Sequence, residues 1–276
     1  DNVLGSSMSL QGLSGENVKI MIDGVPIIGR QNGNIDLSQI NLNAIERVEL
    51  IEGPLSVNYG SNALAGTLNI ITKKSSQETY SAYVNSYAEN IGTYNIDAGL
   101  TFSQNNHFIN VSGGRNFFDG WRTDDNFFDD FGKNVADSSR SKTWNPRTQY
   151  FGRLQYNYQF DKIRVGYRGE YFNEKITNKG LPRAPYYETA FDDYYYTTRI
   201  DQSMYVDGQV AENKFINITA AYNYFKRRKN TLVKYLTTLE ESLTENPSDQ
   251  DTSVFQQWMS RGNFSQSKEG TKNEGF

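Results

Sequence analysis

The sequence lacks cysteine entirely and contains a single histidine among its 276 residues. Disulfide bonds, thiolate metal sites and cysteine nucleophiles are therefore excluded. A zinc site or a Ser-His-Asp triad would depend on His107 alone. That histidine follows Asn105 and Asn106 at the start of a strand-like run, so we expect it to flank a turn. No nucleophile with a base, metal cluster or cofactor motif is visible, and the sequence predicts a protein that is not an enzyme.

Long apolar runs and an excess of one charge are missing as well. No window approaches the length of apolar sequence that a transmembrane helix needs, and no signal-peptide pattern opens the chain. The 28 basic and 32 acidic residues are interspersed and leave a net charge of −4. This balance argues against nucleic acid as a partner.

Aromatic residues are abundant, with 19 Tyr and 16 Phe, although the mean hydropathy is negative. This combination is typical of strands whose two faces meet different solvents. After residue 75 the apolar residues recur with a period of two, so that in segment 150–160 one face is apolar and the other is polar. The same alternation appears in segments 80–84, 96–102, 109–113, 163–171, 204–210 and 216–224, and less regularly in 253–266.

The connections between these strands alternate in length. Tight turns are predicted at 104–106, 161–162 and 212–213, and long polar loops at 119–146, 175–196 and 229–252. Short turns on one rim and long loops on the other are typical of an outer-membrane β-barrel. The alternative is a soluble antiparallel sandwich, which also alternates apolar and polar residues. Strands of about ten to fifteen residues favour the barrel, because globular strands are usually shorter.

The first 74 residues have a different organisation. Strands are predicted at 18–22 and 47–51, with a turn at Asp23-Gly24 and a short helix at 43–46. Tyr-Gly-Ser-Asn at 59–62 and the glycines at 53, 60 and 66 predict further tight bends. This part of the chain reads as a compact α/β unit.

Several motifs in this unit resemble a known family. They are "LQGL", "VKIMIDGVPI" and "INLNAIERVELIEGPLSVNYGSNALAGTLNIITKK". Residues 8–74 resemble the C-terminal half of the plug domain of TonB-dependent outer-membrane receptors. The resemblance implies a membrane all-β fold, in which a 22-stranded antiparallel transmembrane β-barrel holds an N-terminal α/β plug in its lumen. Residues 1–74 would form half of the plug and residues 75–276 about the first eight strands.

Eight strands leave no interior space for such a plug, since a barrel of that size is filled by its own side chains. We therefore expect that further strands follow residue 276, and that the N-terminal half of the plug precedes residue 1.

Most plug-motif residues are expected to shape the plug rather than to touch a ligand. Arg47, Glu49 and Glu52 could in addition form ion pairs that hold the plug to the barrel wall, with residues such as Arg153, Arg164, Arg168 and Glu170. Glu52 departs from the family, where Arg often precedes Gly-Pro. The motif residues are Asp23, Gly24, Pro26, Arg47, Glu49, Glu52, Gly53, Pro54, Tyr59, Gly60 and Gly66.

The resemblance also implies a function and partners. The expected function is uptake of a scarce nutrient across the outer membrane of a Gram-negative bacterium, energised by TonB with ExbB-ExbD. A ferric siderophore is the first expectation for the substrate, with cobalamin, haem, a glycan or a peptide as alternatives. Outer-membrane lipid is an expected partner, and a surface lipoprotein is a further candidate. A passive pore or an adhesin is the alternative of another class.

The ligand site is expected where the plug apices meet the long loops. Aromatic rings and arginines suit aromatic or anionic ligands; alternatively, these aromatics pack the loops or mark the membrane boundary. No metal site is expected, although Asp124-Asp125 and Asp129-Asp130 leave calcium as an alternative without an EF-hand pattern. The candidate ligand residues are Arg30, Gln31, Asn32, Asn34, Tyr59, Ser61, Asn62, Trp121, Arg122, Arg183, Tyr186 and Tyr187.

Overall fold

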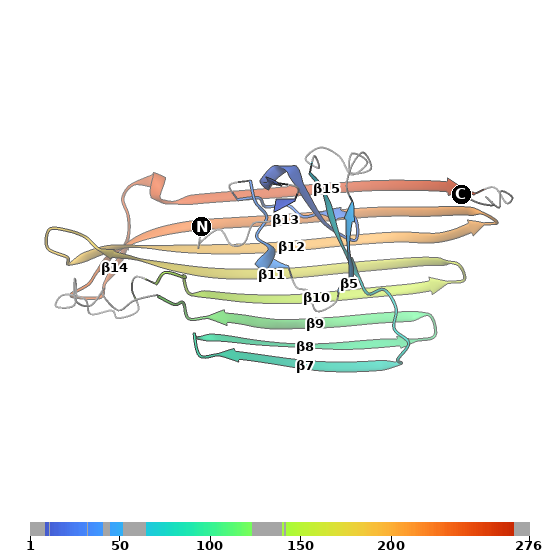
Figure 1. Ribbon diagram of the computed structural model, residues 1–276, viewed down its shortest axis with the longest axis horizontal. Helices are drawn as coiled ribbons and strands as arrows, with labels where there is room; N and C mark the ends of the chain where they lie inside the picture. Colours follow the sequence, from blue (N-terminus) through green and yellow to red (C-terminus); the bar gives the residue numbers. More distant parts are fainter. Residues whose placement is uncertain are drawn as a thin grey trace.

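The computed structural model describes residues 9–10, 12–31, 33–40, 45–51, 65–122, 140 and 142–267. They form a large sheet and a small sheet, and the small sheet lies against one face of the large one with its strands crossing at a steep angle (Figure 1). A short pairing of β1 (Ser9–Leu10) with β2 (Leu13–Ser14) precedes them.

The large sheet is antiparallel, and its long strands pair in the order of the sequence. All of the strand segments predicted after residue 75 are confirmed. The three tight turns are confirmed too, and left-handed φ angles at Asn105, Asn106, Asp161 and Asn213 close them. The strands are β7 (Tyr80–Glu89), β8 (Thr93–Gln104), β9 (His107–Phe118), β10 (Arg147–Phe160), β11 (Ile163–Pro182), β12 (Thr189–Ala211), β13 (Lys214–Tyr235), β14 (Glu241–Leu243) and β15 (Asp251–Gln266).

Two of the predicted long loops are wrong. Most of segment 175–196 is strand, because β11 and β12 stay paired to the Pro182–Ala190 contact and leave only 183–188 as a connection. Likewise β13 continues to Tyr235, and segment 229–252 contains β14 and the short 3-10 helix η4 (Pro247–Asp249). Both faces of these strand ends carry polar and tyrosine residues, so backbone pairing continues where the alternation of side chains has stopped.

The apolar side chains of the large sheet lie on the face that is turned away from the small sheet. On the face away from the small sheet, Val84, Leu100 and Met204 are 72%, 64% and 63% exposed. On the opposite face Gln155 and Asn157 are buried. A soluble sandwich would bury the apolar face against another sheet, whereas here it is the polar face that is covered.

The small sheet has the order β4 (Val25–Pro26), β3 (Val18–Ile22), β6 (Gly66–Thr72), β5 (Ile45–Ile51). β3 and β6 are parallel, and the other two pairs are antiparallel. Asp23 and Gly24 form the two-residue turn between β3 and β4 with positive φ at both positions, as the type I′ hairpin requires. The core of this unit is purely aliphatic: Val18, Ile20, Ile22, Ile27, Ile35, Ala65 and Ile70.

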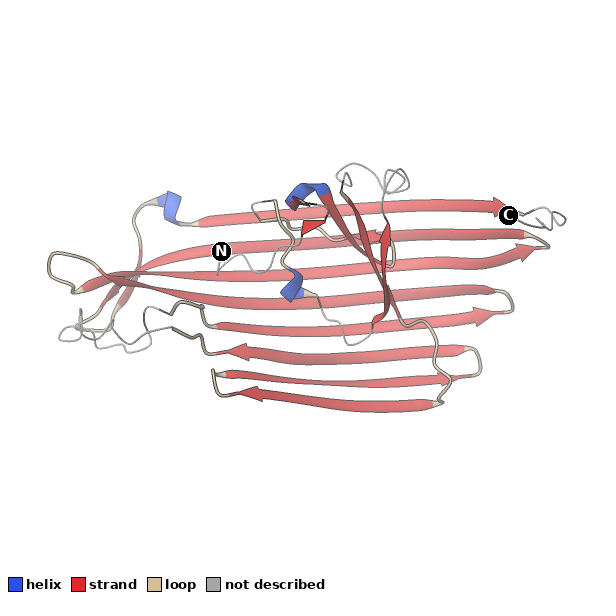
Figure 2. Cartoon of the chain, viewed as in Figure 1, coloured by secondary structure: helices blue, strands red, loops and turns tan. Residues whose placement is uncertain are grey.

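Helical structure in the described residues is limited to short 3-10 turns (Figure 2). In the small unit these are η1 (Gly15–Asn17) and η2 (Leu37–Gln39). The helix predicted at 43–46 is wrong for Ile45 and Glu46, which begin β5 because pairing with β6 overrides the local preference; positions 43 and 44 lie outside the described residues. Within the ranges given above, no helix has the length and apolar character needed to cross a membrane.

Candidate functional site

The first polar contact between the two sheets involves Asp23. Its carboxylate accepts hydrogen bonds from the Thr72 backbone N–H (3.0 Å) and hydroxyl (2.7 Å), both at the end of β6. The Arg168 guanidinium of β11 donates to the same carboxylate at 3.2 Å. Both side chains of this ion pair are nearly inaccessible, with 7% and 2% of their surface exposed. The turn residue Asp23 therefore ties β6 to the hairpin and the small sheet to the large sheet.

A second polar contact involves η2. The Gln39 side-chain amide donates to Glu174 at 3.1 Å, and Gln149 donates to the other oxygen of that carboxylate at 2.8 Å. Arg147 donates to the Ser38 hydroxyl at 2.8 Å. Since Glu174 is fully buried, these amides satisfy a carboxylate that would otherwise be costly to desolvate.

Backbone carbonyls of the small unit accept further bonds. Arg199 donates to the carbonyl of Ile28 at 3.1 Å, and Asn223 donates to that of Pro26 at 3.0 Å. Gly29 follows where the two sheets approach closely, and it has a φ of +89° at a position where a Cβ would overlap the ring of Phe225. Contact here therefore depends on a residue without a side chain.

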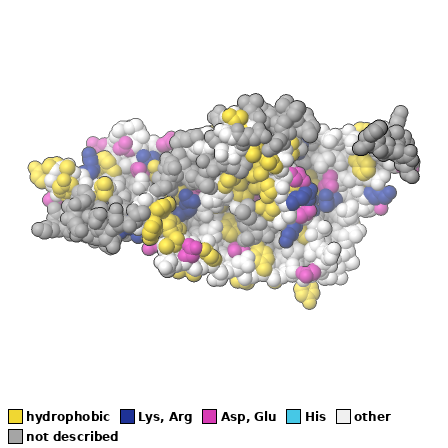
Figure 3. Space-filling view, viewed as in Figure 1, with side chains coloured by type: hydrophobic (Ala, Val, Ile, Leu, Met, Phe, Trp, Pro, Cys, Tyr) yellow, Lys and Arg dark blue, Asp and Glu magenta, His cyan; other side chains and the backbone are white. Residues whose placement is uncertain are grey.

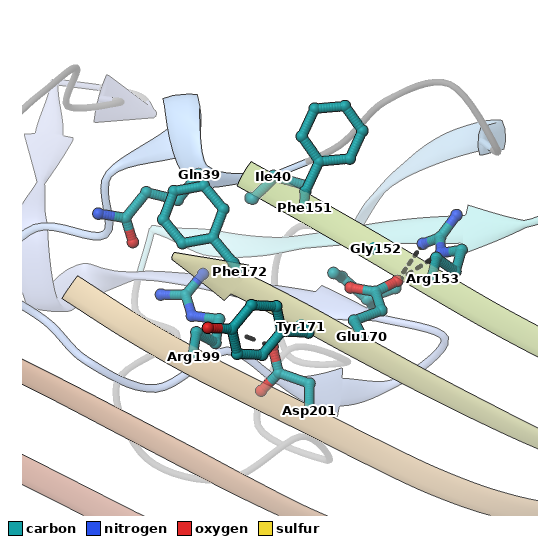
Figure 4. A pocket seen from close by; sticks show the side chains of 11 residues that line it. Gln39, Ile40, Phe151, Gly152, Arg153, Glu170, Tyr171, Phe172, Arg199 and Asp201 are labelled. Carbon is teal, nitrogen blue, oxygen red and sulfur yellow. Dashed lines mark hydrogen bonds and ion pairs between the residues drawn. The ribbon is translucent and has the colours of Figure 1, made fainter. Parts of the chain in front are cut away.

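A cavity of about 20 Å³ remains between the sheets. Figure 4 shows Arg153 of β10 and Glu170 of β11 facing one another beside it, joined by a 2.6 Å hydrogen bond. Arg199 and Asp201, 4.0 Å apart, line another side. The space suits about one water molecule and is too small for a nutrient. On the face of the molecule that carries the small sheet, basic and acidic side chains lie close together beside that sheet (Figure 3).

The electrostatic coupling extends to the small sheet itself. Partial burial lowers the pKa of the Lys19 ammonium, and repulsion by Arg30 and by Arg261 of β15 acts in the same direction. The contact thus combines charged and polar pairs with apolar contacts, such as that of Gly29 with the ring of Phe225, around an incompletely filled space.

The predicted ion pairs of Arg47 and Glu49 with the large sheet are not what the structure shows. Arg47 instead bonds to Glu49 and Glu46 within β5, on an exposed surface. Glu49 also accepts from Asn69 of β6 at 3.3 Å.

The large-sheet residues that were predicted as their partners mostly pair inside the large sheet. Arg153 pairs with Glu170, and Arg164 pairs with Asp207. Arg168 is the one that does reach the small sheet, and its partner there is Asp23 rather than a residue of β5.

The predicted plug apex is only partly described. Arg30 donates to the carbonyls of Gly15 (2.7 Å), Gly33 (2.9 Å) and Val18 (2.7 Å), so its guanidinium holds its own segment together. Gln31 and Asn34 exchange backbone hydrogen bonds. Asn32, Glu52, Gly53, Pro54, Tyr59, Gly60, Ser61 and Asn62 lie outside the described residues.

The other candidate ligand residues lie at the ends of the long strands. Trp121 and Trp144 pair across the connection from β9 to β10, with ring centroids 4.9 Å apart. Arg122, next to Trp121, is half-buried. Arg140 in the same connection forms a buried bidentate ion pair with Asp192 of β12, at 2.6 and 3.0 Å.

The turn at 183–188 presents the second group. Tyr186 is 74% exposed, whereas the Arg183 guanidinium lies 4.0 Å from the ring centroid of Phe191. Tyr187, with a left-handed φ of 58°, donates its backbone N–H to the carbonyl of Arg183. This group belongs to the tip of the β11–β12 ribbon, whereas the bonds of Arg30 described above stay within the small unit.

Sequence reasoning missed Gln39, Ser38, Arg199 and Asn223 as contact residues. Arg199 and Asn223 could have been found from the sequence, because each is a polar residue at one of the alternate strand positions whose side chains face the small sheet. Gln39 and Ser38 carry no such signal, because nothing local separates them from ordinary turn residues. Among the described residues no group of three or more potential metal ligands occurs; the aspartates at 124, 125, 129 and 130 lie outside them.

Comparison with known proteins relates part of this chain to a family. Residues 2–67 match the TonB-dependent Receptor Plug Domain family. A segment of 73 residues is 36% identical to the vitamin B12 transporter BtuB of Vibrio cholerae serotype O1, covering 26% of this chain and 12% of that protein. The chain therefore spans far less than two thirds of this relative.

Solved structures share the fold over nearly the whole chain. The copper transporter OprC matches with a TM-score of 0.55 at 10% identity, over 96% of this chain and 47% of its own. The unliganded ferric citrate transporter FecA matches with a TM-score of 0.49 at 12% identity, over 96% and 48%. The chain spans about half the length of these structures, and at such identities only the fold of OprC is informative.

Proposed function

Because residues 2–67 match the TonB-dependent Receptor Plug Domain family, we propose that the chain is part of a receptor that imports a scarce nutrient across the outer membrane of a Gram-negative bacterium. In this proposal residues 1–74 are the C-terminal half of the plug. Residues 75–276 supply about eight strands of a 22-stranded barrel, the size class in which the lumen is plugged.

One observation carries the proposal. The small sheet is bound to the polar face of a sheet whose opposite, apolar face is exposed. A sheet of this kind suits the wall of a lipid-embedded barrel, with polar residues lining its lumen. The small sheet then occupies the lumen, which is where a transported molecule has to be blocked and released.

The contacts between the sheets suit a plug that moves under force. They are separate hydrogen bonds and ion pairs, such as Asp23–Arg168 and Gln39–Glu174, and a typical single bond contributes about 0.5–1.5 kcal/mol. Most of the aliphatic core packs within the small unit, and Ile22 is the core residue that borders the space between the sheets. TonB, driven by ExbB-ExbD, is the proposed source of the force.

A ferric siderophore is the first proposed substrate. Exposed Tyr186 and half-exposed Tyr187, next to Arg183, provide aromatic and cationic groups for such a ligand at the tip of the β11–β12 ribbon. Cobalamin, haem, a glycan or a peptide are the alternatives within the same type of receptor.

Binding to the full-length receptor tests the substrate class. Titration calorimetry with ferric siderophores and with cobalamin should show one class that binds, and Tyr186→Ala with Tyr187→Ala should weaken that binding. Tyr80→Ala, a change at a tyrosine about as exposed as Tyr186 but near the tight-turn rim, is the matched control and should have no effect. Binding of a glycan or peptide, with neither of the first two classes, would show that the substrate proposal is wrong.

Transport itself separates the receptor from a passive pore or adhesin. Uptake of the bound ligand by cells should require TonB, and deletion of residues 1–74 should raise the conductance of the receptor in a planar bilayer. A conductance that is the same before and after the deletion, with uptake independent of TonB, would favour the passive pore.

A further inference from the structure

The outward face of the large sheet carries two adjacent rows of cross-strand neighbours with an unusual composition. The first row runs from Arg115 through Tyr150 to Lys226, and the second runs through Lys175 and Arg228. Because residues opposite one another in antiparallel strands share a face, all of these side chains point away from the small sheet. The first row is Ile96, Arg115, Tyr150, Asn173, Thr198, Lys226 and Val254; the second is Tyr94, Phe117, Thr148, Lys175, Tyr196, Arg228 and Thr252.

These rows lie at the edge of an uncharged surface. From the row of Tyr171 to that of Ile163, the outward positions of β8 to β15 contain no Asp, Glu, Lys or Arg in the paired register. At a rise of about 3.4 Å per residue and a tilt of about 40°, the distance from Ile163 to the level of Asn173 corresponds to a height of about 26 Å. That is close to the apolar band of about 25 Å that crosses an outer membrane.

The cations of the two rows stand without acidic partners. Neither row contains Asp or Glu, and none of Arg115, Lys175, Lys226 and Arg228 has an ion pair with any described residue. Two outward carboxylates at this end of the sheet, those of Asp192 and Glu241, already pair with Arg140 and Lys234. This excess of positive charge is local, because the chain as a whole has a net charge of −4.

Aromatic rings hold the cations in place. The ring of Tyr196 has the Lys175 ammonium at 5.8 Å and the Arg228 guanidinium at 5.0 Å. Lys175 also lies 4.9 Å from the ring of Tyr194. Lys175 and Arg228 flank Tyr196 on neighbouring strands, so at about 4.8 Å per strand they are about 10 Å apart. Such a spacing lets both reach one anion placed above the tyrosine.

We propose that Arg115, Lys175, Lys226 and Arg228, here called the basic belt, bind the phosphate groups of anionic lipids in the outer leaflet. The inference rests on the proposed function, because it requires the large sheet to span a membrane. The belt lies at the rim opposite the tight turns, which is the extracellular rim of an outer-membrane barrel. Lys and Arg are the usual partners of phosphate, and clusters of them beside a membrane-embedded surface bind anionic headgroups.

A lipid is a better fit than a soluble anion. The belt continues directly into the apolar band, so a molecule held there has its apolar part against Tyr171 and Ile200. A soluble anion gains nothing from that contact. The hydroxyl groups of Tyr196 and Thr198 add hydrogen-bond donors beside the cations.

The test measures retained lipid on the full-length receptor purified in a neutral detergent and exposed to diphosphoryl lipid A. The double variant Lys175→Gln with Arg228→Gln should retain about tenfold less than the unaltered receptor, since each cation near an anionic surface contributes substantially. The matched control is Lys162→Gln with Lys214→Gln, two lysines at the tight-turn rim. It should retain as much as the unaltered receptor.

Three outcomes overturn the inference: equal retention by the double variant, equal loss by the control, or displacement of the lipid by inorganic phosphate at the same concentration. The last would identify a free-phosphate site. Insertion into neutral vesicles, followed by protection from protease, is measured in parallel. A receptor that inserts but shows no belt-dependent retention contradicts only the lipid site, whereas one that does not insert contradicts the proposed function as well.

Discussion

The small sheet and the large sheet place their apolar side chains on opposite sides. In the small sheet Ile20 and Ile70 face inward to an aliphatic core, as in any water-soluble unit. In the large sheet Leu100 and Met204 face outward, and the inward positions hold Gln155 and Asn157. The two regions thus arrange their apolar side chains in opposite ways although they form one contact.

That contact consequently includes many polar groups. Charged pairs such as Asp23–Arg168 stand there beside a few apolar contacts, such as that of Phe225 with Gly29. Buried ion pairs add little net stability compared with apolar packing, but the loss of one partner is costly. The effect of a substitution should therefore depend on where it lies: in the contact between the sheets, in the aliphatic core of the small sheet, or on the outward face of the large sheet.

The largest effect is expected at the contact. Asp23→Ala removes the partner of buried Arg168 and two bonds to Thr72, so it should destabilise the small sheet by about 3–5 kcal/mol. Hydrogen exchange of the β3 and β6 amides in the full-length receptor measures this. Adding Arg168→Met should recover much of the loss. If the double variant is no more stable than Asp23→Ala, the uncompensated charge is not the cause.

The next prediction compares the same substitution, Ile→Ala, in the aliphatic core and on the outward face. Ile20→Ala leaves a cavity in the aliphatic core and should cost about 2–5 kcal/mol in the free energy of unfolding of the small sheet. Ile218→Ala on the outward face should cost less than about 1 kcal/mol, because lipid chains fill the space. Hydrogen exchange for the first and denaturant unfolding in vesicles for the second provide the values. Equal costs would break the comparison.

A third effect depends on depth along the outward face. Leu154→Arg, inside the uncharged band, should cost about 2–4 kcal/mol of barrel stability, because it places a charge in hydrocarbon. Thr252→Arg, in the second row of the belt, should cost at most about 1 kcal/mol. Both are measured by denaturant unfolding of the receptor in neutral vesicles. A similar cost at both positions would mean that the band does not mark the membrane.

The long strands of the fold could be predicted from sequence because the period of two is a direct consequence of strand geometry. The failures at 175–196 and 229–252 have one cause. Beyond the uncharged band both faces of the strands carry polar and tyrosine residues, and Tyr194 and Tyr195 stand on opposite faces of β12 with no polar alternation to reveal the strand. Hydrogen bonding to neighbouring strands, which the sequence does not display, continues the structure there.

The contact residues were less accessible to prediction. Arg168 was identified as an inward charge, but its partner was expected on β5, at a residue such as Glu49, and is Asp23 in the hairpin turn. The turn predicted at Asp23-Gly24 is confirmed. Because the turn by itself explains an aspartate at this position, nothing in the sequence indicated that the carboxylate also contacts the large sheet. Which loop of a small sheet touches a wall depends on the docking angle, and no local pattern encodes it.

The smallest effect is expected at Arg47, and it tests that correction. Its ion pairs to Glu46 and Glu49 are exposed, so Arg47→Gln should leave the stability of the small sheet nearly unchanged. Salt screens such pairs, and the difference in stability between this variant and the unaltered receptor should vanish at high ionic strength. Hydrogen exchange of the β5 and β6 amides at low and high salt measures both. A loss as large as that of Asp23→Ala, persisting in high salt, would restore Arg47 as a residue that holds the two sheets together.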